Sequence, residues 1–292
     1  MSMQTEQKKK ALFLYSSATG KEKKQRQLAR ILPRLEALFD LTVHQNETME
    51  EGVALARESC GVYDALILFG GDGSLNHIVS ALAEKENAPI FGYLPGGTLK
   101  DGGKNLGAKS IEKGLRVIEQ GHVAKLDLVK ANGDYFMYVA GFGAYMDVSY
   151  VARRRAKKAL GRVVYYLLCI KEMFRIRHHE IDIESDEGAF HGKVSVAAFL
   201  NGKWLGGMKV NKRGRLNDGR LEILLVRPRL FNGFLSFFFH AGFKRLYGSQ
   251  IKVTIDNGVE WCLDGEKGPK GPLKMEVAQG ALKAYCDPRQ LD

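Results

Sequence analysis

The chain has 292 residues, a formal net charge of +11, 45% hydrophobic residues and 26% charged residues. This length is sufficient for two domains with a substantial core, and the composition excludes a largely disordered chain. The four cysteines are scattered with no CxxC pair, which favours a reducing cytoplasm over a disulfide framework or a structural zinc site. No long apolar segment follows the N-terminal lysines, so we expect no signal peptide.

Basic residues are concentrated at residues 153–177, which contain nine Lys or Arg and one acidic residue. Such an excess can bind nucleic acid or an anionic membrane surface, or it can form a solvated face. No nucleic-acid-binding motif accompanies it, so we predict no nucleic-acid partner. The longest apolar runs, residues 163–170 and 234–239, are too short for a transmembrane segment. The sequence therefore favours a cytoplasmic protein that associates peripherally with anionic lipids, with the solvated face as an open alternative.

The first part of the chain alternates between apolar runs and helical patterns, which is typical of a doubly wound α/β domain. We predict strands at residues 10–15, 41–45, 65–69 and 90–94, and helices at residues 22–39, 49–59 and 111–120. A further helix is expected after residue 73, because Leu75, Ile78, Val79 and Leu82 recur at helical spacing. We place this domain at residues 1–125.

After residue 125 the pattern changes to short alternating strands separated by Gly, Asn and Asp turns. It predicts a β-sandwich-like domain over residues 126–292, whose last residues can pack back on the first domain. We expect helical insertions at residues 152–174 and 230–246. The aromatic second insertion fits a buried helix or a membrane-facing lid.

The central stretch is residues 65–76, which read ALILFGGDGSLN. Glycines let the backbone adopt positive φ and approach a ligand closely, and the N–H groups that open a helix favour an anion. A second glycine turn, PGGT, follows the next strand at residues 95–98. Both turns are expected at the same carboxyl edge of a parallel sheet, which indicates a phosphate site. Neither GxxxxGK[ST] nor a complete GxGxxG is present, and a tight connection is the alternative.

GGDGSLN, PGGT and the LDGE of residues 263–266 together resemble the diacylglycerol kinase catalytic family, in its soluble bacterial lipid kinase branch. That family is related to sphingosine kinases and NAD kinases, and the resemblance covers nearly the whole chain in order. It implies an ATP-dependent lipid kinase that uses Mg²⁺ and transfers the γ-phosphoryl group to a lipid hydroxyl, with a diacylglycerol-like acceptor by default. The implied partner is a lipid substrate at a membrane surface, and a homodimer stays open.

The resemblance also implies a nucleotide site on the first domain. Asp72 can coordinate Mg²⁺ through its oxygens, or it can serve as an Asp-Gly turn residue. Thr48 can lie near the nucleotide, cap the following helix, or do both. The implied nucleotide-binding residues are Thr48, Gly71, Asp72, Gly73, Ser74, Leu75, Asn76, His77 and Thr98.

The resemblance implies that Glu266 is the proton acceptor, with Asp264 its partner near metal or substrate. Two adjacent carboxylates raise one pKa, which suits a general base, although Asp-Gly is also a hairpin signal. It further implies a structural Mg²⁺ held by the Asp218 side chain and the backbone carbonyls of Arg215 and Arg220. An ordinary turn is the alternative there.

Several positions depart from the family pattern GGDGTLNE followed by GT-x-NDFAR-x-LG. Lys100 stands in place of Asn, Gly102 and Gly103 in place of Phe-Ala, and His77 in place of Glu. Lys100 can bind a phosphate as a point charge. The departures keep open an NAD kinase-like small-molecule kinase and a degenerate protein that binds nucleotide or membranes without turnover.

Overall fold

The computed structural model describes residues 8–16, 21–97, 99–143, 178–227 and 243–291. The chain divides into two compact units. The first unit consists of Met1–Leu126 together with Ala281–Asp292, and the second unit is Asp127–Gly280. Each unit has its own hydrophobic core. Units of this kind need not fold independently, so the domains at residues 1–125 and 126–292 stay a prediction.

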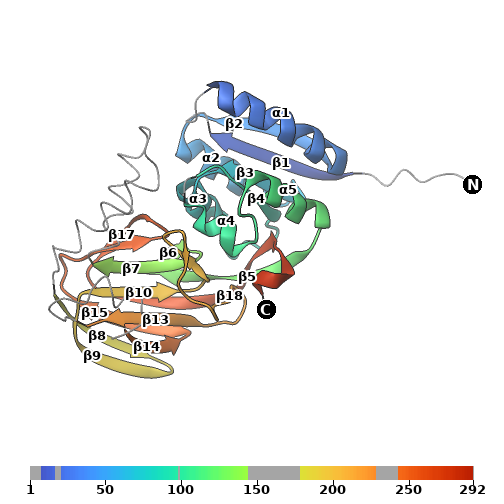
Figure 1. Ribbon diagram of the computed structural model, residues 1–292. Coiled ribbons are helices and arrows are strands. Elements are labelled where there is room, and N and C mark those ends of the chain that lie inside the picture. The colour runs from blue at the N-terminus through green and yellow to red at the C-terminus, as the bar shows by residue number, and fades with distance from the viewer. Residues whose placement is uncertain (1–7, 17–20, 98, 144–177, 228–242, 292) are drawn as a thin grey trace, which may run out of the picture. The chain divides into compact units, whose positions relative to one another are not determined.

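The first unit is a parallel sheet with helices between its strands (Figure 1). The strand order is β2-β1-β3-β4-β18, and each neighbouring pair is parallel. The elements are β1 (Lys9–Ser16), α1 (Lys21–Leu38), β2 (Phe39–Asn46), α2 (Met49–Glu58), β3 (Ala65–Gly70), α3 (Asp72–Leu82), β4 (Ile90–Pro95), α4 (Asp101–Asn105), α5 (Ile111–Gln120) and the end of β18 (Leu273–Tyr285).

Helices cover both faces of this sheet. Alternate residues of a strand point to opposite faces, and one set, which includes Phe13 and Ile67, shares a buried cluster with Ile31 of α1 and Ile118 of α5. Helices α2 and α3 contact each other and strands β1 and β3. They contribute no residue to that cluster, so they cover the other face. The predicted doubly wound fold is confirmed.

The C-terminal residues belong to the first unit. Ala284 pairs with Phe91 of β4, and the Asp287 N–H donates to the Leu106 carbonyl at 3.1 Å. The Asp287 carboxylate accepts from the Arg289 guanidinium at 2.7 Å and from the Arg289 N–H at 3.1 Å. These hydrogen bonds hold the pKa of Asp287 below its ordinary value of 3.8.

We expect Asp287→Asn to make stability less dependent on pH in the acid range. A carboxyl with a lowered folded-state pKa contributes stability that is complete above its ordinary pKa and is lost as pH falls through the folded-state pKa. Urea unfolding between pH 7 and pH 2.5 should therefore show a deficit in the variant at pH 7 that shrinks below about pH 3.8. Parallel curves for variant and wild type would contradict this, and Asp40→Asn, an exposed carboxylate on β2, is the control.

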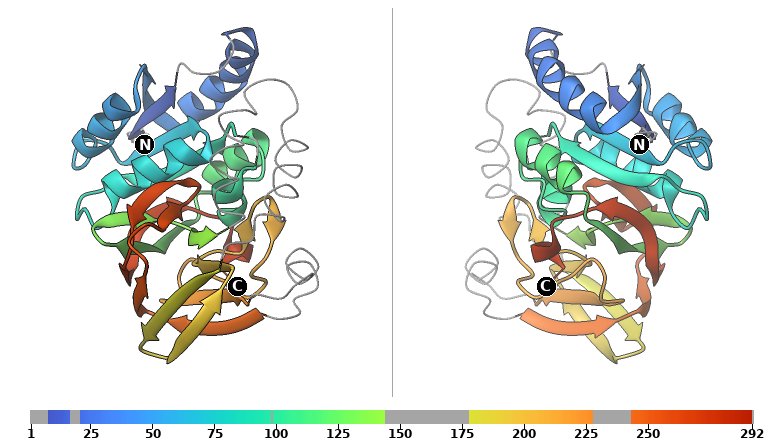
Figure 2. Two further views of the ribbon diagram at one scale, coloured as in Figure 1. Left: turned by 90° about the vertical axis from the view of Figure 1, so that its left-hand side faces the viewer. Right: turned by 90° about the vertical axis from the view of Figure 1, so that its right-hand side faces the viewer.

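The second unit contains two larger antiparallel sheets and a small two-stranded sheet of β11 and β12. One larger sheet has the order β14-β13-β10-β7-β16-β17, and the other contains β18-β15-β8-β9. Figure 2 shows the β8–β9 hairpin in yellow beside the orange strands. The bounds are β5 (Val123–Ala131), β6 (Asp134–Phe136), β7 (Val139–Gly143), β8 (His179–Ser185), β9 (Gly188–Val194), β10 (Val196–Leu200), β11 (Trp204–Leu205), β12 (Met208–Lys209), β13 (Leu221–Val226), β14 (Phe243–Gly248), β15 (Gln250–Ile255), β16 (Glu260–Leu263) and β17 (Glu266–Lys270).

One core joins the two sheets of this unit. Phe142, Phe199 and Trp261 from the first sheet share a buried cluster with Ile183 and Val253 from the second. Trp261 also donates its indole N–H to the Gly271 carbonyl at 2.8 Å, so its polar atom is satisfied inside the core. Two sheets that bury one shared core form a sandwich, which confirms the predicted fold class.

The two expected helical insertions fall mostly outside the described residues. Residues 152–174, with most of the basic segment, and residues 230–242 lie outside the described residues. The helix predicted to run to residue 246 is wrong for its last part, because Phe243–Gly248 form β14 and pair with β13. Within the described chain, none of the helices has the length and apolar character needed to cross a membrane.

Candidate functional site

The two glycine turns of the first unit lie against each other, as predicted. Strands β3 and β4 are paired in parallel up to Gly70 and Pro95, and the Gly96 N–H donates to the Gly70 carbonyl at 2.7 Å. A Cβ atom added to Gly97 would lie 3.3 Å from the Cα of Gly71. Glycine is needed here for this close approach. The sequence also led us to expect positive φ at these glycines. This expectation is wrong, because Gly70, Gly71 and Gly73 do not adopt positive φ.

Asp72 begins α3 and joins the two turns. Its buried carboxylate accepts the Lys100 N–H at 3.1 Å and the Gly102 N–H at 3.2 Å. The carboxylate thereby caps α4 from a distant part of the chain, satisfying donors that a helix start leaves without partners. Lys100 itself has a φ of 59°, a left-handed conformation that the carboxylate contact stabilises. The predicted Mg²⁺ contact of Asp72 stays a prediction beside this capping role.

Helix α4 was missed by the sequence analysis and carries buried charges. Asp101 and Lys104 are both buried, and the Lys104 ammonium lies 3.5 Å from an Asp101 carboxylate oxygen. The Asn105 side chain donates to the Asp101 carbonyl at 3.1 Å. Buried charges are rare without a partner, and here each is the partner of the other. We add Asp101 and Lys104 to the candidate site because they lie on the helix that Asp72 caps. The sequence signal that could have identified this pair is the spacing of three residues between Asp101 and Lys104 after PGGT.

We expect Gly103→Ala, which restores the alanine of the family pattern, to destabilise the protein by about 1–3 kcal/mol. The added Cβ would lie 2.5 Å from the Ala108 carbonyl oxygen and 3.1 Å from Pro95, so backbone must move. At an open helical position the same change would instead stabilise by about 0.5–1 kcal/mol. Urea unfolding distinguishes the two signs, and a more stable variant would contradict the close packing.

The other predicted nucleotide-binding residues lie on α3 or at the start of α2. Ser74 is half-buried, Leu75 and Asn76 are buried, and His77 is exposed. Thr48 caps α2 by accepting the Glu51 N–H at 3.1 Å, which confirms its alternative role. Thr98 lies outside the described residues. Nucleotide contacts of all these residues stay predictions.

In the second unit, Asp264 and Gly265 form the tight turn between β16 and β17. Their φ values are 49° and 86°, and Leu263 pairs with Glu266 across the hairpin. Positive φ at both central residues is typical of the two-residue turn that Asp-Gly favours. The hairpin signal in the sequence is therefore confirmed, and it places Glu266, which is half-buried, at the first position of β17.

The carboxylate of Asp264 is fully buried and holds the segment before β7. It accepts the N–H groups of Met137 at 2.6 Å, Tyr138 at 3.0 Å and Val139 at 2.9 Å. The Tyr138 hydroxyl donates to the Asp264 carbonyl at 3.0 Å. These bonds give Asp264 a structural role that the adjacent-carboxylate argument did not foresee. Its predicted role beside metal or substrate stays a prediction, as does the proton-acceptor role of Glu266.

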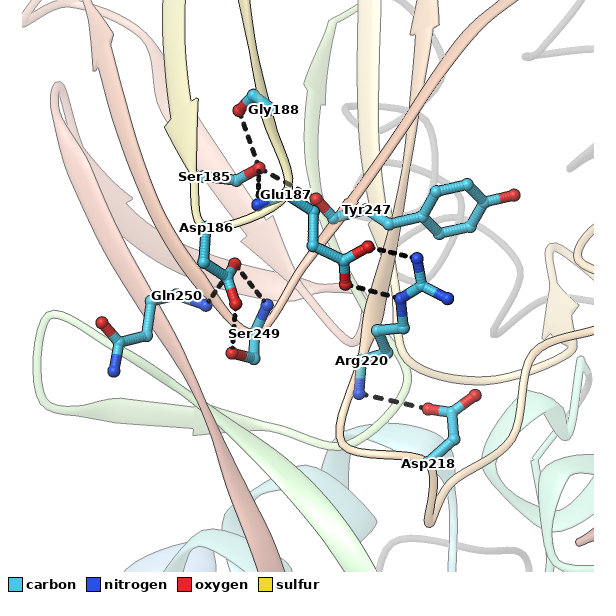
Figure 3. Close-up of polar contacts among 9 residues, drawn as sticks. All are labelled: Ser185, Asp186, Glu187, Gly188, Asp218, Arg220, Tyr247, Ser249 and Gln250. Carbon is cyan, nitrogen blue, oxygen red and sulfur yellow. Dashed lines mark hydrogen bonds and ion pairs between the residues drawn. The ribbon is translucent and has the colours of Figure 1, made fainter.

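The segment predicted to hold Mg²⁺ precedes β13. Asp218 accepts the Arg220 N–H at 3.2 Å (Figure 3), and the buried Asp127 accepts the N–H groups of Gly219 at 2.7 Å and Gly280 at 2.8 Å. Burial raises the pKa of both carboxyls, and the charge of Asp127 adds to the rise at Asp218. Divalent cations prefer carboxylate and carbonyl oxygens, the donor types that Asp218, Arg215 and Arg220 offer, so these residues fit Mg²⁺. No group of three acidic, His or Cys side chains poised for a metal occurs in the described ranges.

Residues 10–131 match the diacylglycerol kinase catalytic domain. A Bacillus subtilis protein named diacylglycerol kinase is 27% identical over 89% of this chain and 90% of its own length. A Staphylococcus saprophyticus protein of the same name is 31% identical over 75% of this chain and 73% of its own length. The chain belongs to the diacylglycerol kinase family.

The diacylglycerol kinase likeness extends to the fold. The crystal structure of a candidate diacylglycerol kinase from Bacillus anthracis strain Sterne matches with a TM-score of 0.86 at 26% identity, over 96% of this chain and 98% of that one. The matched catalytic domain contains both glycine turns, whereas Asp264 and Glu266 lie beyond its last residue. The match to the catalytic domain therefore does not test the roles of those two residues, which stay what the LDGE resemblance implies.

Proposed function

We propose that this chain is an ATP-dependent lipid kinase that transfers the γ-phosphoryl group of ATP to the hydroxyl of a diacylglycerol-like lipid. The observation that supports this most is the family: relatives named diacylglycerol kinase match over 75% to 89% of the chain. The two glycine turns lie against each other at the start of α3. The first N–H groups of a helix have no acceptors within the helix, so this position favours an anion such as a phosphate.

Phosphoryl transfer requires a positioned triphosphate and a group that takes the proton of the acceptor hydroxyl. In this proposal the backbone of Gly71 to His77 and Thr98 bind the phosphates. Asp72 keeps the second turn in register through its bonds to Lys100 and Gly102. Glu266 accepts the proton while the hydroxyl oxygen forms its bond to the γ-phosphorus and ADP leaves.

Mg²⁺, when bound, neutralises phosphate charge and stabilises the fold near its ligands. The residues that would hold the structural ion are Asp218 through its carboxylate and Arg215 and Arg220 through their carbonyls. A lipid acceptor also implies work at a membrane surface, and the basic excess of residues 153–177 would favour anionic lipids. A cytoplasmic location, peripheral membrane binding and a homodimer belong to this proposal.

The test is transfer of labelled γ-phosphate from ATP with Mg²⁺ to a panel of lipid alcohols in mixed micelles. NAD serves as the soluble acceptor and Glu266→Gln as the blank. We expect label in diacylglycerol that the variant does not produce. Label in NAD alone would favour the small-molecule kinase. ATP binding by the folded protein with no labelled product would favour the degenerate binder, for which the Lys100 and His77 departures are the motivation.

A further inference from the structure

Three turns of the second unit lie around Arg220 (Figure 3). They are the β8–β9 turn with Asp186 and Glu187, the loop that leads from Asp218 into β13, and the β14–β15 connection with Ser249. Asp186 accepts the Ser249 N–H at 2.8 Å and its hydroxyl at 2.6 Å. The first and third turns are therefore fixed to each other by a carboxylate that does not contact the second.

The guanidinium of Arg220 is bound by the first of these turns. Its Nε donates to one Glu187 oxygen at 2.6 Å and its Nη2 donates to the other, which is a bidentate pair. The guanidinium carbon also lies 4.6 Å from the centre of the Tyr247 ring. Carboxylate and aromatic ring together hold the planar group in one place, a geometry that suits arginine and not lysine.

Asp218 lies two residues before Arg220 and accepts its backbone N–H, not its guanidinium. Only its Oδ1 has a hydrogen bond within the described chain, to the Arg220 N–H at 3.2 Å, and no ion pair joins its carboxylate to either neighbouring arginine there. In Figure 3 the Arg220 side chain extends to Glu187, and Asp218 is joined only to the backbone N–H of Arg220. Freed from Glu187, an arginine two residues away would be a strong competitor for that carboxylate.

We propose that Glu187 is a positioning residue for the proposed cation site at Asp218. It binds the Arg220 guanidinium and so keeps a competing positive charge away from the Asp218 carboxylate. The inference rests on the proposed function, because it assumes that Asp218 takes a divalent cation. It assigns a role to the β8–β9 turn, which the reaction itself does not need.

The experiment measures Mn²⁺ binding to the full chain, with Mn²⁺ as a paramagnetic substitute for Mg²⁺ that prefers the same oxygen ligands. Free Mn²⁺ is quantified by electron paramagnetic resonance without nucleotide, and Asp218→Asn defines the part of the binding that depends on Asp218. The variants are Glu187→Gln and the double variant Glu187→Gln with Arg220→Gln. Asp186→Asn is the matched control, since it changes a carboxylate to an amide in the same turn without contacting Arg220.

We expect Glu187→Gln to raise the dissociation constant of the Asp218-dependent Mn²⁺ binding about threefold to fivefold, the range for one partly exposed ion pair. The double variant should return it to within about twofold of wild type, and Asp186→Asn should leave it unchanged, with far-UV circular dichroism confirming folded proteins. Unchanged binding in Glu187→Gln, or an equal loss in the double variant, would overturn the inference alone. Binding that Asp218→Asn does not alter would overturn it together with the proposed cation site, while the labelled-phosphate assay still tests the kinase reaction.

Discussion

Replacing Glu266 with glutamine is expected to lower the rate of phosphoryl transfer by on the order of 10² to 10⁴. Glutamine keeps the size and hydrogen-bonding capacity of the side chain but cannot take a proton from the acceptor hydroxyl. Glu266 is half-buried at the first position of β17, beyond the tight turn, where glutamine occupies the same space. The measurement is kcat and KM for ATP and lipid, beside urea unfolding of both proteins.

The change in kcat relative to the KM for ATP shows at which stage Glu266 acts. A base that acts only in the transition state lowers kcat and leaves the KM for ATP close to wild type. Lys267→Gln, at the next and exposed position of the same strand, is the matched control and should retain activity. If the Glu266→Gln enzyme kept more than about a tenth of the wild-type kcat, the proton acceptor would have to be another residue.

Local chemistry explains why much of the fold was predictable. Short apolar runs of the length of Ala65–Gly70 need burial on both faces, and helices alternate with them, so a parallel sheet is the expected solution. The contact of the two glycine turns follows from strands that neighbour each other in sequence and in the sheet. Asp264-Gly265 identifies its turn because few residue pairs adopt positive φ twice at low cost.

The contacts that define the candidate site are not local, and the sequence did not predict them. Asp72 reaches backbone N–H groups 28 and 30 residues away, and Asp264 reaches N–H groups more than 100 residues away. Two glycines within five residues disfavour a helix, yet α4 forms because Asp72 caps it and only glycine fits against Leu75 and Ala108. Tertiary packing therefore overrides propensity at this point.

The same reasoning explains the incorrect helix end. Residues 243–248 read FKRLYG, in which apolar and basic residues alternate only roughly, so the aromatic helical pattern before them was extended too far. In the structure they pair with all six residues of β13 from Val226 to Leu221. This pairing is what places Tyr247 under the Arg220 guanidinium.

Replacing Asp264 with alanine is expected to lower the free energy of unfolding by about 3–5 kcal/mol, because three buried N–H donors lose their acceptor together. The donors belong to consecutive residues, Met137, Tyr138 and Val139, so no rotation of one peptide can satisfy them all. Alanine would also have to adopt a φ near 49°, which asparagine and aspartate tolerate better. Urea unfolding, followed by the fluorescence of Trp261 in the same hairpin, measures the loss.

Asparagine at the same position separates the structural role of Asp264 from a role in the reaction. Its carbonyl oxygen can still accept from Tyr138 and Val139, but its amide group would oppose the Met137 N–H, so we expect a smaller loss of about 1–3 kcal/mol. If Asp264 only supports the fold, folded Asp264→Asn should keep a kcat within about tenfold of wild type, unlike Glu266→Gln. A stable but inactive Asp264→Asn enzyme would instead place this carboxylate in the reaction beside Glu266, and an alanine variant as stable as wild type would refute the structural role.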